Sequence, residues 1–500
     1  MPALPPPAHH RTQIFLASTL YGAATLAAAL DAGCFTPADR RLLLVANTAA
    51  VPETTPALDE APGFERLRSR FDGVLSWNDA IRPFHPSGWS PRPDDAPLWE
   101  RHLRLLWDLG DDDVSLAVES LQVSPALAIV QCFPDAPLDV YADGLMSYGP
   151  TRNKLDPLIG TRVGRLLHLD LVPGLRPLLL SEFGVAPEIV PTEVFTKVLA
   201  ELADAAPALD APEGAALLLG QYLSALDILT PEEEEQLHVR MLRGAAGRGH
   251  RELVFKPHPA APARWSQMLE EEAGRLGVTL TVLDTPVLAE VAYQRLRPAL
   301  VTGCFSTALL TATTFYGLPA AHTGTDLLLE RLSPYQNSNR VPVTLVDATL
   351  PALETPLRAD SPQPALWAGV PQGDGGPPCS SGAESLGEGG HNATHGRAPE
   401  NGGPGDLNGL LAAVGFAMQP QIYPNLRPAA ERYLTTHLTP HTRRYFKRRR
   451  LTVLALPGAV PSQLGFLPRN PTVRKVARRA RALQRRLSKA KAPAKTRVTT

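Results

Sequence analysis

The stretch TQIFLASTLYGAATLAAALDAGCFTPADRRLLLVA, residues 12–46, runs from a buried strand through a helix to a second strand. Residues 12–18 are an apolar run that enters an alanine-rich helical segment, Ala23 to Ala32, which Gly33 closes. The run Leu42 to Ala46 has the length and apolar character of another buried strand. Because strands that are apolar on both faces need helices on both sides of their sheet, this stretch predicts a parallel α/β sheet with crossover helices.

The same alternation continues through the first third of the chain. A helix is predicted from Trp99 to Leu109, where apolar side chains recur at helical spacing. Apolar runs of strand length predict further strands at residues 73–75, 127–133, 138–141 and 166–172.

A second α/β series begins near residue 212. The sequence Thr230-Pro231-Glu232-Glu233 is a capping box with proline at the first helical position, so a helix is expected to begin there. Strands of this series are expected at 215–219, 253–255, 280–283 and 299–302. Two such halves, joined near 190–212, predict two Rossmann-like domains that face each other, 1–200 and 212–357. Ligands of such folds bind at the C-terminal ends of the strands, in the crevice between the domains.

The remaining residues form three segments of different composition. Residues 361–405 hold 12 Gly and 7 Pro, and such a stretch buries too little apolar surface to offset the entropy of ordering it. We therefore predict a disordered insertion over 358–406. A helical pattern resumes at Leu407 to Met418 and opens a return segment, 407–450, that we expect to pack on the folded body. Residues 451–500 are predicted to be a basic tail.

Charge is distributed unevenly along a chain whose formal net charge is −1. Nineteen of the 49 Lys and Arg residues lie in 432–500, which contains no Asp or Glu. Within that region, residues 473–487 place apolar side chains on one helical face and basic side chains on much of the rest. Such a helix suits an anionic membrane surface. The lack of interleaved aromatic residues argues against nucleic acid, and the alternative is a solvated, partly disordered tail.

Several classes of protein are disfavoured by what the sequence lacks. The four cysteines have neither CxxC pairs nor metal-ligand spacing, which argues against a zinc site. Residues 1–10 do not have the basic start and apolar core of a signal peptide. No run approaches the ~20 apolar residues that span a bilayer. We therefore expect a cytoplasmic protein, which the basic helix would hold at the inner face of the membrane.

An acidic residue ends one of the predicted strands. In Val140-Tyr141-Ala142-Asp143-Gly144 the apolar run stops at a carboxylate followed by glycine, which leaves room for a ligand or a tight turn. Asp143 at such a position can act as the general base that takes a proton from a sugar hydroxyl. The alternative is that Asp143 caps a turn, as Asp-Gly pairs routinely do.

A histidine between two prolines follows another predicted strand. In Leu253-Val254-Phe255-Lys256-Pro257-His258-Pro259 the prolines restrict the backbone on both sides of His258 and fix where its imidazole points. Histidine titrates near neutral pH and can donate a hydrogen bond or a proton to a phosphate. Lys256 adds a nearby cation. The alternative is a structural histidine.

Two hydroxyl residues stand where a strand passes into a helix. In Thr302-Gly303-Cys304-Phe305-Ser306-Thr307 the hydroxyls precede the apolar stretch 308–315. Ser or Thr at a helix start is an ordinary N-cap. The same position also offers free backbone N–H groups and hydroxyls to a phosphate, and the two interpretations are compatible.

Taken together, these three elements resemble the bacterial sialyltransferases, and most closely the bacterial polysialyltransferase-like glycosyltransferases. That family has a GT-B fold and shares a pair of acidic residues before glycine, a His-Pro dipeptide and a Ser/Thr pair. Here the three motifs appear in order as Ala142-Asp143-Gly144, His258-Pro259 and Ser306-Thr307. Gly220-Gln221 resembles the family's loop after the first strand of the second domain, and Pro286 to Glu290 resembles its donor-binding segment more weakly. The resemblance spans roughly residues 12–350.

The resemblance implies an inverting transferase that moves sialic acid, or a related keto-sugar acid, from a CMP donor to a cell-surface glycan or capsular polysaccharide. Its first domain would bind the acceptor and its second domain the donor nucleotide. It also implies Asp143 and His258 as catalytic residues, without a metal or another cofactor. The donor-binding residues that it implies are Lys256, Pro259, Ser306, Thr307, Gly220, Gln221 and Glu290.

One motif departs from the family pattern. The first acidic position, which usually has the general-base role, is Ala142 here, and only Asp143 remains. Either Asp143 takes over as base, or the acid comes from elsewhere, with Asp139 as a further candidate, or catalysis is lost. Two alternatives therefore stay open: a GT-B transferase with a UDP- or CDP-linked donor, and a non-catalytic GT-B module that binds a nucleotide or a glycan.

Overall fold

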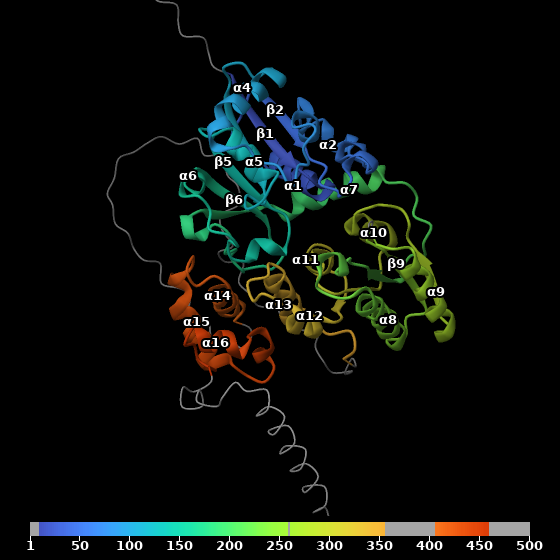
Figure 1. The fold of residues 1–500 in the computed structure, drawn as a ribbon. Coiled ribbons are helices and arrows are strands. Elements are labelled where there is room, and N and C mark those ends of the chain that lie inside the picture. The colour runs from blue at the N-terminus through green and yellow to red at the C-terminus, as the bar shows by residue number, and fades with distance from the viewer. Residues whose placement is uncertain (1–9, 259–260, 356–405, 460–500) are drawn as a thin grey trace, which may run out of the picture. The chain divides into compact units, whose positions relative to one another are not determined.

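The computed structural model describes residues 10–258, 261–355 and 406–459. The chain divides into two compact units, Met1–Phe446 and Lys447–Thr500. The first unit contains two separate β-sheets with helices around them (Figure 1). Within the second unit, the described residues contain the single short helix α16 (Arg448–Val453).

Both sheets are parallel throughout. The seven-stranded sheet has the order β3-β2-β1-β4-β5-β6-β7, and the five-stranded sheet has the order β10-β9-β8-β11-β12. The strands of the first sheet are β1 (Arg11–Ala17), β2 (Arg40–Val45), β3 (Gly73–Ser76), β4 (Asp113–Glu119), β5 (Leu138–Ala142), β6 (Val163–Leu169) and β7 (Ala186–Val190). Those of the second are β8 (Ala216–Leu219), β9 (Glu252–Lys256), β10 (Thr279–Val282), β11 (Leu300–Gly303) and β12 (Ala320–His322).

Helices connect these strands. In the first unit the α-helices are α1 (Leu20–Asp31), α2 (Glu65–Arg68), α3 (Trp77–Ala80), α4 (Ala96–Leu106), α5 (Ala126–Cys132), α6 (Pro157–Gly160), α7 (Thr192–Ala205), α8 (Pro231–Gly247), α9 (Arg264–Leu276), α10 (Ala289–Leu296), α11 (Thr307–Thr314), α12 (Thr325–Arg331), α13 (Arg340–Thr349), α14 (Leu407–Met418) and α15 (Arg427–His437). The short 3-10 helices are η1 (Pro52–Thr54), η2 (Leu58–Glu60), η3 (Pro93–Asp95), η4 (Leu145–Tyr148), η5 (Ser181–Phe183), η6 (Ser224–Leu226), η7 (Pro424–Leu426) and η8 (Thr442–Tyr445). The capping box predicted for α8 is formed, because Thr230 Oγ1 accepts from Glu233 N at 3.2 Å and the Glu233 carboxylate accepts from Thr230 N at 3.0 Å.

The first sheet is covered on both faces. Along β1, Ile14 and Leu16 point to one side and join the apolar cluster that contains residues of α4 and α5. Phe15 points to the other side, where its ring packs edge-on against Phe35 and Phe71. In Figure 1 helices α4 and α2 lie on opposite sides of strands β1 and β2. Burial on both faces explains why the central strands are continuous apolar runs.

One predicted strand is wrong. Residues 127–133, expected to be extended, lie almost wholly in helix α5. A short buried apolar run has no polar face to reveal its period, so periodicity alone does not separate strand from helix. The place beside β5 is taken instead by β4, which was not predicted because it begins at Asp113, the third of three consecutive aspartates.

The predicted junction near 190–212 is largely helical. Helix α7 occupies Thr192–Ala205 and buries Phe195, Val198 and Leu202 on one stripe at helical spacing. It packs against α1, which follows the first strand of the first sheet, and against α10, which belongs to the second α/β series. The connection between the halves is therefore itself part of the packed structure.

The segment that begins at residue 406 packs against residues of the first sheet's loops. Helix α14 matches the expected range, and its glycine Gly415 lies so close to Leu178 that an added Cβ would meet that side chain at 2.5 Å. Tyr423 is bonded to the loops that follow strands β5 and β6, since its hydroxyl donates to Leu178 O at 2.9 Å and accepts from Thr151 N at 2.9 Å. These contacts return the chain to residues of the first half.

Some predicted features lie outside the described residues. They are the insertion predicted over 358–406, apart from its last residue, the amphipathic helix at 473–487, and Pro259 of the His-Pro motif. In the part of the chain that the structure describes, no helix is both long enough and apolar enough to cross a membrane.

Candidate active site

A cavity of about 410 Å³ lies where strand ends of the two sheets meet. The first sheet contributes residues that end or follow β4 and β5, and the second contributes residues that follow β8 and β11. Pro342 of α13 and Met418 of α14 close a further side. The carboxyl edge of parallel strands is where ligands of such folds bind. Four of the predicted site residues line this cavity: Asp143, Gln221, Ser306 and Thr307.

Asp143 directly follows strand β5, and its loop touches the second half of the molecule. The next residue, Gly144, comes so close to helix α11 that an added Cβ would lie 3.3 Å from Thr307 Oγ1. The backbone N–H of Leu145 donates to the same oxygen at 3.4 Å. The sequence motifs at 142–144 and 306–307 therefore meet in one place.

The first turn of helix α1 forms one wall around Asp143. Thr19 caps this helix by accepting from Gly22 N at 2.9 Å. A Cβ at Gly22 would lie 2.9 Å from the hydroxyl of Tyr141 and 3.5 Å from Oδ2 of Asp143. Glycine at this position therefore lets both side chains approach the helix N-terminus, whose partial positive charge favours a carboxylate.

The pKa of Asp143 is raised to about 7, first by burial and second by the negative charge of Glu119. Part of the side chain opens onto the cavity, while the surrounding protein excludes bulk water. A carboxyl with such a pKa is able to hold a proton or release it near neutral pH. Removing it from water destabilises the charged form and makes the carboxylate a stronger base.

Glu119 is a lining residue that was not predicted. It ends strand β4 and is opposite Tyr141 of β5 in the register of the sheet. The Tyr141 hydroxyl donates to Oε2 of Glu119 at 3.2 Å. Burial raises the pKa of Glu119, and hydrogen bonds from Ser18 and Tyr141 oppose that rise. In the sequence the residue is a lone glutamate in an unpredicted strand, so only the sheet order reveals its place.

The hydroxyl pair stands at the N-terminus of α11. Ser306 is the N-cap, and its Oγ accepts from Ala308 N at 3.3 Å. Gln221, after β8, is held by Phe305 N, which donates to its Oε1 at 3.0 Å. The N-cap interpretation is thus correct for Ser306, and the same geometry presents Ser306 and Thr307 to the cavity.

Three predicted donor residues cluster just outside this lining. Gly220 N donates to the carbonyl of Lys256 at 2.9 Å, and a Cβ at Gly220 would lie 2.9 Å from the Phe255 ring. Burial lowers the pKa of Lys256, and Glu290 opposes that shift. Glu290 is itself buried and accepts from Thr311 Oγ1 at 2.6 Å. In this structure Glu290 therefore interacts with Thr311 and Lys256 of the protein itself.

His258 also lies outside the lining of the cavity. Its ring centroid is 6.2 Å from that of Tyr222, which in turn packs edge-on against Trp265 at 5.6 Å. Burial is the main cause that lowers the pKa of His258, Lys256 adds to it, and Glu234 opposes it. The imidazole is consequently neutral at pH 7 and able to donate a hydrogen bond without carrying a charge.

Asp139 is already engaged in an ion pair. The guanidinium of Arg165 donates to the two carboxylate oxygens of Asp139 at 3.0 and 2.9 Å. Asp139 also lies three residues before Ala142, the residue that ends β5 at the cavity. It is therefore a poor candidate for the missing acid. In the described ranges no group of three or more His, Cys, Asp or Glu residues could hold a metal ion.

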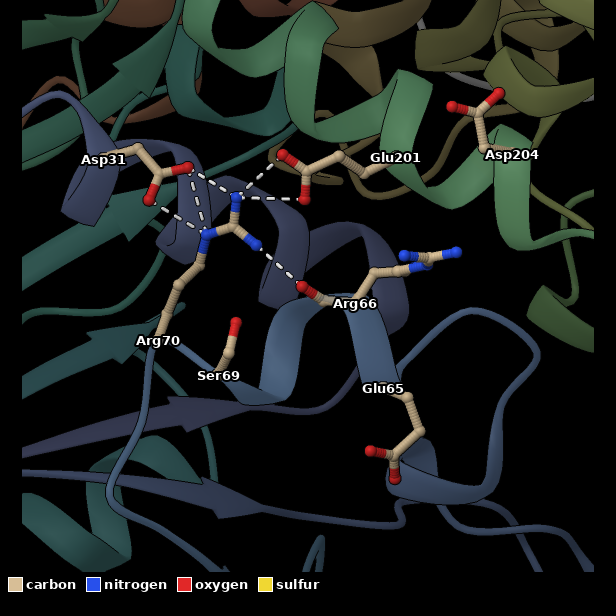
Figure 2. Close-up of a pocket in the computed structure, with 7 residues that line it drawn as sticks. All are labelled: Asp31, Glu65, Arg66, Ser69, Arg70, Glu201 and Asp204. Carbon is tan, nitrogen blue, oxygen red and sulfur yellow. Dashed lines mark hydrogen bonds and ion pairs between the residues drawn. The ribbon is translucent and has the colours of Figure 1, made fainter.

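A larger hollow, of about 580 Å³, lies elsewhere and contains no predicted site residue. Figure 2 shows its central Arg70 between Asp31 and Glu201, with hydrogen bonds to both carboxylates. The hydrogen bonds to Asp31 raise the pKa of Arg70. Since its one central cation is already paired with two acids, this hollow offers little to an anionic ligand.

Comparison with known proteins places the chain among glycosyltransferases. A family model described as alpha-2,8-polysialyltransferase (POLYST) matches residues 13–325, more than half of the chain. No curated protein matches the chain significantly.

Similar solved structures include the GT-B domain of a sialyltransferase from Photobacterium damselae. It is 11% identical, with a TM-score of 0.38, over 67% of this chain and 96% of that one. Another is MurG from Acinetobacter baumannii, 10% identical, with a TM-score of 0.36, over 68% of this chain and 82% of that one. The two parallel sheets with a cavity at their strand ends agree with the GT-B fold that the sequence predicts.

Proposed function

The chain belongs to the alpha-2,8-polysialyltransferase family of glycosyltransferases, and we propose that it transfers sialic acid, or a related keto-sugar acid, from a CMP donor to a glycan with inversion. The observation that carries this proposal is that Asp143 from one half and Ser306-Thr307 from the other line a single cavity. An acceptor hydroxyl and a donor phosphate could therefore be held side by side.

In the proposed reaction Asp143 is the general base. The oxygen of the acceptor hydroxyl forms a bond to the anomeric carbon of the donor sugar. The bond from that carbon to the phosphate oxygen breaks, and its electron pair leaves with CMP. The hydroxyl proton passes to the carboxylate of Asp143, whose pKa of about 7 suits this transfer at neutral pH.

The start of α11 is the proposed phosphate site. Thr307 Oγ1 accepts from Leu145 N and Ser306 Oγ accepts from Ala308 N, so each hydroxyl hydrogen can still be donated to a phosphate oxygen. The helix N-terminus adds partial positive charge. In the proposal Gln221, Gly220, Lys256, His258, Pro259 and Glu290 complete the donor side, with neutral His258 donating to the departing phosphate.

Arg152 supports an acidic sugar over a neutral one. It is the only positively charged side chain among the described residues that line the cavity. One of its nitrogens lies 3.3 Å from the Oγ of Ser338, which leaves other N–H groups for a ligand. A guanidinium binds a carboxylate with two parallel hydrogen bonds, and a keto-sugar acid carries such a group.

The basic C-terminal region suggests where the enzyme works. We propose that the helix predicted at 473–487, which is outside the described residues, binds anionic lipid at the inner face of the membrane. Each Lys or Arg near such a surface contributes on the order of 1 kcal/mol. Vesicles with anionic lipid should then bind the full chain, and a chain that ends at Pro471 should lose this binding. Equal binding to neutral vesicles would contradict the proposal.

Transfer assays separate the proposal from its alternatives. The full chain is incubated with CMP-sialic acid and a panel of glycan acceptors, and parallel reactions use UDP- and CDP-linked sugars. Calorimetry measures the affinity for CMP, UDP and CDP. Product from the CMP donor supports the proposal, and a clear preference for UDP or CDP overturns it. Binding of CMP without turnover of any acceptor would favour a non-catalytic module.

A further inference from the structure

We propose that Glu119, at the end of the strand beside that of Asp143, takes the place of the carboxylate that Ala142 lacks. In this role Glu119 is a positioning residue, which acts on the acceptor's proton through Asp143. The inference rests on the proposed function of the cavity and adds to it an acidic partner from a different strand.

The order of the strands brings the two acids together. Strands β4 and β5 are parallel neighbours, and Glu119 is opposite Tyr141 in their register. Residues paired in a parallel ladder point to the same face of the sheet, and neighbouring strands lie about 4.8 Å apart. Glu119 therefore shares the face of Tyr141, while Ala142, one residue further on, points to the other face, so Glu119 supplies its charge from the opposite side of the strand end. Glu119 thus lies beside the segment that carries Ala142 and Asp143, and both acids line the same cavity. Its position relative to the motif is set by the sheet and not by the sequence spacing.

Tyr141 links Glu119 to the rest of the site. Its hydroxyl lies 2.9 Å from the carbonyl of Leu16 and 3.2 Å from Oε2 of Glu119, so its single proton is shared between these acceptors. The Cβ position of Gly22 is 2.9 Å from the same hydroxyl and 3.5 Å from Oδ2 of Asp143. The phenol and the Asp143 carboxylate therefore gather at the first turn of α1, and Glu119 is held there by a direct contact to the phenol.

The charge of Glu119 changes how readily Asp143 takes up a proton. After burial, Glu119 is the group that contributes most to the raised pKa of Asp143. The other groups that face the pair are the phenols of Tyr141 and Tyr21 and, across the lining, Arg152. Two carboxyls in one enclosed site favour a state in which they hold one proton between them. A proton taken from an acceptor hydroxyl is then stabilised on Asp143 by the negative charge of Glu119.

The exchange of two residues tests this inference. Glu119→Gln keeps the shape and an acceptor for Tyr141 but removes the charge. Its kcat is expected to fall on the order of 10-fold, less than the ~10²–10⁴-fold of a lost general base, and the acidic limb of its pH profile should move to lower pH. Adding Ala142→Asp to this variant should restore activity and return the acidic limb toward that of the unaltered chain. Glu193→Gln, an exposed change on α7, serves as the control and should alter neither.

The competing outcomes are distinguishable. The melting temperature and the calorimetric CMP affinity show whether the Glu119→Gln variant is folded. The Glu119→Asp variant keeps the charge and should retain more activity than Glu119→Gln. A folded Glu119→Gln variant with unchanged kcat and an unchanged pH profile overturns the inference and leaves the proposed function intact. If the unaltered chain transfers no sugar, the proposed function fails. NMR titration of the Asp143 carboxyl then still shows whether the pKa of Asp143 depends on the charge of Glu119. A pKa of Asp143 that stays the same in Glu119→Gln would overturn the inference in that case.

Discussion

The backbone N–H of Leu145 donates a 3.4 Å hydrogen bond to Oγ1 of Thr307, which lies 162 positions further along the chain. Leu145 stands two residues after Asp143, and Thr307 is the first residue of α11. The bond therefore joins the loop of the proposed base to the proposed phosphate site. A change at either end is expected to disturb both.

Thr307→Val keeps the shape of the side chain and removes its oxygen. The variant loses the acceptor for Leu145 N and a donor for the phosphate, so its affinity for CMP should fall on the order of 10-fold. Calorimetry with CMP measures this. The matched control is Thr313→Val, near the end of the same helix, whose hydroxyl bonds only to carbonyls of that helix. Equal losses in both variants would contradict a ligand role for Thr307.

Gly22→Ala should impair transfer because a Cβ at this position would lie 2.9 Å from the Tyr141 hydroxyl, closer than real Cβ atoms come. The buried phenol would have to move, and Asp143 with it. We expect a lower kcat in the transfer assay with little change in CMP affinity. Gly247→Ala, at the end of α8 with no atom near its Cβ position, is the control and should keep full activity.

Asp143→Asn is predicted to stabilise the fold at alkaline pH. A carboxyl whose pKa rises from its ordinary value of 3.8 to about 7 binds more protons in the folded state than in the unfolded state between these values. Its contribution to stability therefore falls as the pH rises through that window. The variant should melt higher than the unaltered chain at pH 8, and the difference should shrink as the pH approaches 4.

Asp139→Asn is the control for this stability measurement. Asp139 is paired with Arg165 by two hydrogen bonds, so its removal should not raise the melting temperature at pH 8. A melting temperature of Asp143→Asn that equals or falls below that of the unaltered chain at pH 8 would mean that Asp143 is not buried in a costly charged form.

Glu234→Gln should destabilise the loop that carries Gln221. The buried carboxylate of Glu234 accepts from Leu223 N at 2.6 Å and from Ser224 N at 2.8 Å. A glutamine has only one acceptor atom there and turns its NH₂ toward a donor, so we expect a loss of about 1–3 kcal/mol in the free energy of unfolding. Urea unfolding measures it, and Glu232→Gln, exposed on the same helix, should cost less.

Much of the fold was predictable because the central strands are buried on both faces. The run Leu42 to Ala46 has the length and apolar character of a strand in a covered sheet, and it is buried there. Two elements were harder to predict, one of them the central strand of the first sheet. Strand β4 was missed because it starts among three aspartates, and α5 was misassigned because a short apolar run carries no period.

The site was predictable where a motif sits at a strand end. Asp143 follows a strand of the first sheet and Thr307 follows a strand of the second, and both strand ends open onto the same cavity. Glu119, Gly22 and Arg152 were not predictable, since their roles depend on which strands and loops become neighbours. The sequence around them carries no unusual pattern: the strand order β4-β5 reveals Glu119, the approach of α1 reveals Gly22, and the lining of the cavity reveals Arg152.

The most direct test of the account is the transfer rate of Asp143→Asn beside that of the unaltered chain, with CMP-sialic acid as donor, measured across pH 5 to 9. We expect product from the unaltered chain, with kcat/KM rising as the pH passes about 7, the pKa of Asp143. For the variant we expect a loss of ~10²–10⁴-fold, with CMP affinity retained. Equal rates in the two proteins would contradict the assignment of Asp143 as the base.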